Sequence, residues 1–182
     1  MFFGSLTTPF WTNGRGCALI VSNPRDGENS MSENGPGSGR AGPGGKGEAR
    51  QDYALTTRGV TVTVRSFYLA DQSSPDDNRF VWAYRVRIEN HGSDTVRLLR
   101  RTWQITDARG RTQHVHGPGV VGEQPVLGPG QSFEYTSGTP LDTPSGFMVG
   151  AYHMIVPGSG ENFDVAIPAF SLDSPHQSGR IH

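Results

Sequence analysis

Three glycines at a fixed spacing are the first residues in this chain that could do chemistry. Gly117, Gly119 and Gly122 follow the pattern G-x-G-x-x-G, which in dinucleotide sites lies between a strand and a helix whose amides receive a pyrophosphate. The residues that follow are rich in proline and glycine, so a βαβ dinucleotide site is not expected. Two interpretations stay open: a turn whose amides hold a phosphate or nucleotide, or a purely structural loop.

Two histidines separated by one residue form a second candidate site. Alternation along a strand places the imidazoles of His114 and His116 on one face, close enough to share a metal ion. Such a pair needs further ligands, and His153 and Asp164 serve only if other strands bring them near. The alternative is that both histidines are solvated polar residues of a strand.

The search for catalytic residues finds none. The segment 71–78 is rich in oxygen atoms but lacks the spacing and the closing glutamate of a calcium loop, so it predicts a turn. No serine lies in a G-x-S-x-G motif, and no pair of carboxylates has a spacing typical of general acid and base. The sequence therefore favours a binding or regulatory module without a cofactor over an enzyme.

The elements that must position these residues are strands, because apolar side chains alternate with a period of two. The clearest strand is 80–89, with one aromatic and aliphatic face and one mainly polar face. Seven short strands without crossover helices predict an all-β antiparallel sandwich. The predicted strands are 60–65, 80–89, 95–106 with a bulge at Leu98 and Leu99, 111–115, one around Phe133 and Tyr135, 147–156, and 163–167, which Pro168 ends.

Residues 116–131 are predicted to form an irregular loop between the fourth and fifth strands. Loops of this length in compact domains are often functional, so we predict that it is the main contact surface. Arg100 or Arg101 would assist there if the ligand is an anion, because guanidinium groups bind phosphates and carboxylates bidentately.

Composition divides the chain into a flexible Gly/Pro-rich leader, residues 1–52, and a folded domain, residues 53–182. Residues 23–52 contain eight glycines and three apolar side chains, too few to offset the entropy of ordering, so we expect disorder there. Met31 opens a segment with the composition of a disordered leader, which suggests a start of translation there, and Met1 stays the alternative.

Charge and apolar content restrict the partners of the domain. The formal net charge is −1, which provides no field to attract nucleic acid. The longest apolar run of the leader, residues 18–21, is too short to cross a membrane or direct secretion. Cys17 is the single cysteine, which excludes an internal disulfide and fits a reducing compartment. We therefore expect a cytoplasmic protein that binds neither membrane nor nucleic acid.

From about residue 58 to the end, the chain resembles the ApaG domain family. The features that carry the resemblance are spread in order over about 125 residues. They are Gln72-Ser73-Ser74-Pro75, Trp103, the glycine motif with Gln124-Pro125, Pro129-Gly130, Tyr135-Thr136-Ser137-Gly138, the run Pro144-x-Gly146-x-Met148-x-Gly150-x-Tyr152-x-Met154, Ile167-Pro168-x-Phe170, and the ending Ile181-His182.

The resemblance implies a fibronectin type III-like sandwich. It implies a bacterial protein linked to cobalt and magnesium efflux and divalent-cation homeostasis, and, from eukaryotic relatives that carry the domain in larger proteins, a protein-binding role. A pyrophosphate or nucleotide contact discussed for the family would fall on Gly117, Gly119 and Gly122. The sequence predicts neither the partner nor the oligomeric state.

Overall fold

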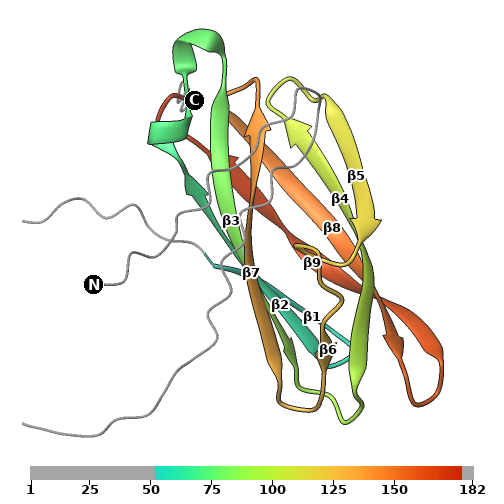
Figure 1. Ribbon diagram of the computed structural model, residues 1–182. Helices are drawn as coiled ribbons and strands as arrows, with labels where there is room; N and C mark the ends of the chain where they lie inside the picture. Colours follow the sequence, from blue (N-terminus) through green and yellow to red (C-terminus); the bar gives the residue numbers. More distant parts are fainter. Residues whose placement is uncertain (1–51, 178–182) are drawn as a thin grey trace, which may run out of the picture.

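The structure, a computed structural model, describes residues 52–177. The predicted leader, apart from Asp52, and the last five residues lie outside this part. The described residues form two antiparallel sheets packed as a sandwich (Figure 1), so the predicted all-β fold is confirmed. None of its helices is long and apolar enough to cross a membrane.

Each sheet contains strands from two separate parts of the chain. The first sheet has the order β1 (Tyr53–Thr57), β2 (Val60–Tyr68), β3 (Phe80–Asn90) and β7 (Ser132–Leu141). The second has the order β5 (Thr112–Pro118), β4 (Val96–Asp107), β8 (Ser145–Val156) and β9 (Glu161–Asp173), and β6 (Val126–Leu127) pairs with the start of β4. The segment 71–78 forms the predicted turn as two 3-10 helices, η1 (Ala70–Gln72) and η2 (Pro75–Asp77).

Two of these strands were not expected from the sequence. The side chains of β1 are mostly exposed, so burial imposes no apolar alternation on them. The strand β6 has only two residues and lies inside the segment predicted as an irregular loop. That segment also begins later than predicted, because β5 extends to Pro118. The predicted loop 116–131 is therefore wrong at its start and at its centre.

Pro168 does not end the last strand, which continues to Asp173. The register between β8 and β9 shifts where Met148 pairs with Phe170 and Gly150 pairs with Ile167. Pro168 thus lies in an irregular part of the ladder, where the missing N–H of proline costs no regular hydrogen bond. The bulge predicted at Leu98 and Leu99 is confirmed by a register shift between Leu98 and Arg100.

The core lies between the sheets and is rich in aromatic side chains. The rings of Tyr84 and Trp103 are 5.5 Å apart between centroids, and that of Phe170 is within 6.0 Å of both. Beside them the hydroxyls of Tyr135 and Tyr152 share a buried hydrogen bond of 2.6 Å. Burial is the largest influence on Tyr152 and raises the pKa of its hydroxyl well above the ordinary value, so the group stays neutral.

The two long seams between the sheets are different. On one side β1 and β2 lie against β9: Tyr53 and Ser171 share a hydrogen bond of 2.9 Å, and the Ser66 hydroxyl donates to the Ser171 carbonyl at 2.9 Å. On the other side the sheets end in the edge strands β5 and β7 (Figure 1). Residues of β4, β5 and β7 line a groove there. We call these the closed seam and the open seam.

Candidate functional site

The glycine motif ends β5 and forms a tight turn. The amide of Val120 donates to the carbonyl of Glu123, and that of Glu123 to the carbonyl of Val120, both at 2.8 Å. The central residues Val121 and Gly122 have φ angles of 45° and 81°, as in the type I′ turn of a hairpin. A β-branched residue at positive φ is strained, so Val121 is held there by its surroundings.

Packing explains why residue 119 is a glycine. Its φ is +55°, and a Cβ atom would lie 2.1 Å from the carbonyl oxygen of Glu123. Its amide donates to Leu99 at 2.9 Å, so this amide already has an acceptor. The geometry thus gives Gly119 an architectural role, whereas Gly122 at φ +81° has open space around it.

The two candidate arginines point to opposite faces of their sheet. Arg101 pairs across β4 and β5 with Gly117, and its Nη1 atom donates to the carbonyls of Pro118 at 3.1 Å and Gly119 at 2.7 Å. A Cβ atom on Gly117 would lie 3.4 Å from that nitrogen, so the missing side chain leaves space for the guanidinium. Arg100 is exposed on the outer face. The turn therefore presents carbonyls, rather than amides, to Arg101.

The two candidate histidines lie on the same outer face, exposed to solvent. His116 pairs with Thr102 and His114 with Gln104 on β4. Across residues 52–177, no group of three or more His, Cys, Asp or Glu side chains is placed to hold a metal ion. His153 and Asp164 are brought together with each other, at 2.7 Å between Nδ1 and Oδ1, on β8 and β9. Metal binding at the histidine pair stays a prediction.

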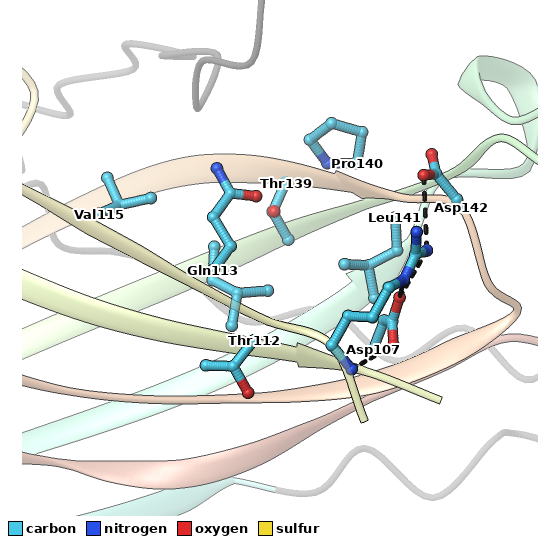
Figure 2. A pocket seen from close by; sticks show the side chains of 10 residues that line it. Asp107, Thr112, Gln113, Val115, Thr139, Pro140, Leu141 and Asp142 are labelled. Carbon is cyan, nitrogen blue, oxygen red and sulfur yellow. Dashed lines mark hydrogen bonds and ion pairs between the residues drawn. The ribbon is translucent and has the colours of Figure 1, made fainter. Parts of the chain in front are cut away.

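A groove that the sequence did not predict lies in the open seam. It has a volume of about 540 Å³ and is lined by β4, β5, β7 and the turns that follow β4 and β7 (Figure 2). Its apolar lining comes from Ile105, Val115 and Leu141. Thr139 lies among them and is 3% exposed, yet within residues 52–177 no hydrogen bond is formed by its hydroxyl. Gln113 of β5 lines the same groove (Figure 2).

A charged cluster closes one end of the groove. The guanidinium of Arg111 donates to Oδ2 of Asp107 at 2.7 Å and lies 3.6 Å from Oδ2 of Asp142 (Figure 2). Burial alone would raise the pKa of Asp107, but the amides of Arg111 and Arg109 and the Arg111 guanidinium hold that pKa below its ordinary value. Asp107 is therefore ionised at neutral pH, and its acceptor sites are occupied from within the chain.

The outer edge of β5 runs along this groove with unpaired backbone groups. The Asp107 amide donates to the Arg111 carbonyl and the Gly119 amide to the Leu99 carbonyl, which sets the alternation along β5. The odd-numbered residues of β5 direct their N–H and C=O groups toward β4. The even-numbered residues Thr112, His114 and His116 direct theirs outward. In the described structure no strand pairs with this edge. Pro118 occupies the next outward position, where an N–H is not needed.

Comparison with known proteins identifies the family to which this fold and these sites belong. Residues 70–156 match the family described as the ApaG domain. The chain is 68% identical over 130 residues to the Protein ApaG of Paramagnetospirillum magneticum and 67% identical over 128 residues to that of Rhodospirillum centenum. These alignments cover 71% and 70% of this chain and 99% and 98% of the relatives. The chain belongs to the ApaG family.

A solved structure of a similar protein has the same fold. The crystal structure of an ApaA protein from Bordetella pertussis aligns with a TM-score of 0.62 and 47% identity, covering 65% of this chain and 95% of that one. The name Protein ApaG states no enzymatic activity. Both the glycine turn and the groove lie within the residues that match the ApaG domain.

One sequence signal could have located the groove. The inward-facing positions of β7 read Phe133, Tyr135, Ser137, Thr139 and Leu141. Two hydroxyl residues therefore occupy buried positions of a strand that is otherwise aromatic or aliphatic there, although buried polar groups normally have hydrogen-bond partners. The alternation reveals these hydroxyls, but only the pairing order shows that they face an open seam.

Proposed function

We propose that this ApaG-family chain is a non-enzymatic protein-interaction module that binds an extended segment of a partner protein along the outer edge of β5. One observation carries the proposal: the outward N–H and C=O groups of this edge run beside a groove of about 540 Å³ with an apolar floor and with the Thr139 hydroxyl in its wall. An extended segment that adds to a sheet edge gains main-chain hydrogen bonds, and its alternate side chains enter the neighbouring pockets.

The biological setting follows from the family. The resemblance to ApaG proteins links the module to cobalt and magnesium efflux, and in this proposal it acts there by binding another protein in the cytoplasm. The edge of β5 has no lysine, and its proline lies at its end, so it has few of the features that protect edge strands from pairing with other chains.

A pair of variants at His114 tests the edge directly. Pro removes the outward N–H of residue 114, whereas Ala keeps it and removes the same imidazole. Because Pro118 already occupies an equivalent outward position, both variants should keep the fold. Nine-residue peptides selected from a phage library on the full chain provide the probe, and their affinity is measured by fluorescence anisotropy.

We expect His114→Pro to weaken binding of the selected peptides roughly tenfold, as the loss of a backbone hydrogen bond predicts, and His114→Ala to leave it within about twofold. Thermal unfolding of both variants checks that the domain is intact. Failure to select any peptide, or equal binding by both variants, would overturn the proposal.

A second candidate is phosphate or nucleotide binding at the turn formed by Gly117, Gly119 and Gly122. It is supported by the strained φ of Val121 and by the consecutive amides of Val121 and Gly122, which have no acceptor in residues 52–177. Pyrophosphate or ATP at 100 times its dissociation constant would stabilise the fold by about 2.7 kcal/mol. A melting temperature that does not change with either ligand, against chloride at equal ionic strength, would exclude this candidate.

A further inference from the structure

The chemistry of the groove changes along its length. Ile105 and Leu141 provide an apolar floor, and both are more than nine-tenths buried. The Thr139 hydroxyl and the Gln113 amide add polar atoms to the wall, and within the described part of the chain neither has a hydrogen-bond partner. Among residues 52–177 the buried side-chain polar atom without a partner is the Tyr68 hydroxyl, whereas the oxygen of Thr139 is open to the groove, where an occupant can reach it.

The charges at the end of the groove indicate which kind of side chain enters it. Asp107 is saturated, because it accepts from the amides of Arg109 and Arg111 and from the Arg111 guanidinium. Asp142 is 76% exposed, and Arg111 approaches it only to 3.6 Å. Among the side chains that line the groove, two carboxylates face one guanidinium, which leaves one negative charge in excess.

We propose that the partner segment carries a lysine or arginine that points into the groove and ends at Asp142. This inference rests on the proposed function, since it specifies the segment that pairs with β5. The methylene stem of the side chain lies over Ile105 and Leu141 and passes the Thr139 hydroxyl, and its cationic end reaches Asp142 at the end of the groove (Figure 2). Long basic side chains suit such a site because they combine an apolar stem with a charged tip.

An acidic side chain fits this end of the groove less well. Arg111 is already engaged by Asp107 through two nitrogens and faces Asp142 as well. A partner carboxylate would have to displace one of these contacts and approach the excess negative charge. An added strand directs every second side chain inward, so one basic residue in the right register is sufficient.

Two matched pools of fluorescein-labelled peptides test the inference. Both contain nine-residue peptides of random Val, Thr, Ser and Gln composition; one pool has a lysine at a central position, and the other has glutamine there. Anisotropy with the full chain at low salt gives the ratio of their affinities. The variants are Asp142→Asn and, as a control for net charge, Asp94→Asn in the turn before β4, at the opposite end of that strand.

We expect the lysine pool to bind wild type about twofold to fivefold more tightly, the range for an exposed ion pair. The preference should disappear in Asp142→Asn, persist in Asp94→Asn, and shrink at 0.5 M salt because the charges are screened. Equal binding of both pools, or a preference unchanged in Asp142→Asn, would overturn the inference that the partner carries a basic side chain. It would not affect the proposed binding along β5. If His114→Pro binds both pools as wild type does, or if neither pool binds wild type, the proposed binding along the edge of β5 is wrong.

Discussion

The closed and open seams of the sandwich use their polar groups in opposite ways. At the closed seam, the hydroxyls of Tyr53 and Ser66 bond to Ser171, and the Trp82 indole donates to the carbonyl of Asp173 at 3.1 Å. At the open seam, the Thr139 hydroxyl lies in a groove without a partner among residues 52–177. One seam joins the sheets through hydrogen bonds, although the Tyr68 hydroxyl at the end of β2 is buried without a partner among these residues, and the other leaves the Thr139 oxygen open to the groove.

This difference separates residues that stabilise the fold from residues that are available to bind. Hydrogen bonds across the closed seam stabilise the native state, since their loss would leave buried groups unpaired. A groove with an unpartnered hydroxyl adds little to stability and is expected where a protein binds a ligand or partner. Substitutions at the two seams should therefore change stability and binding separately.

The largest effect is expected from Trp82→Ala on β3, next to the closed seam, because its indole also bonds to β9. The side chain is 1% exposed, packs against Tyr68 and Phe80, and bonds to β9. Its removal should lower the free energy of unfolding by roughly 3–5 kcal/mol, the range for a large buried aromatic residue. Chemical denaturation measures this change. A loss below about 1 kcal/mol would mean that the seam is not closed in solution.

A smaller effect is expected at the turn that ends β5, from Gly119→Ala. The new Cβ would meet the Glu123 carbonyl at 2.1 Å, and the backbone stands at positive φ, so the free energy of unfolding should fall by more than about 1 kcal/mol. Gly122→Ala is the matched control, because it has positive φ but open space. If both variants lose the same stability, the positive φ alone explains why residue 119 must be glycine, and packing against Glu123 is not the reason.

Periodicity was sufficient to predict the fold. The alternation in β3 places Trp82, Tyr84, Val86 and Ile88 on the core face, where each is buried. It also reveals the bulge after Leu98, because a phase slip changes which residues are apolar. Pro168 was misjudged because a proline rule considers one strand, whereas its place opposite a register shift depends on how β8 and β9 pair.

The groove could not be predicted in the same way. It is formed by residues from β4, β5 and β7, which become neighbours only through the strand order of two sheets. The glycine motif was found from its spacing, but the spacing does not indicate that Arg101 turns inward to the carbonyls of Pro118 and Gly119. Side-chain direction near a bulge depends on the register, which the sequence does not give.

A moderate loss is expected from Tyr53→Phe at the closed seam. The change removes one hydroxyl and its hydrogen bond to Ser171 but keeps the ring against Phe170. The free energy of unfolding should fall by about 0.5–1.5 kcal/mol, and peptide binding should not change. Denaturation and anisotropy on the same preparation measure both quantities. A weaker affinity for peptides would show that the closed seam also takes part in binding.

The smallest change in stability is expected from Thr139→Val at the open seam, with the opposite sign. Valine keeps the shape of threonine and removes a hydroxyl that has no partner in the described residues, so the free energy of unfolding should stay the same or rise by up to about 1 kcal/mol. Binding of both peptide pools should weaken, because the bound segment loses a hydrogen-bonding group in the wall of the groove. Thr139→Ser keeps the hydroxyl and should retain binding. If Thr139→Val destabilises the domain by as much as Tyr53→Phe does, the hydroxyl serves the fold, and the two seams do not differ in the way described.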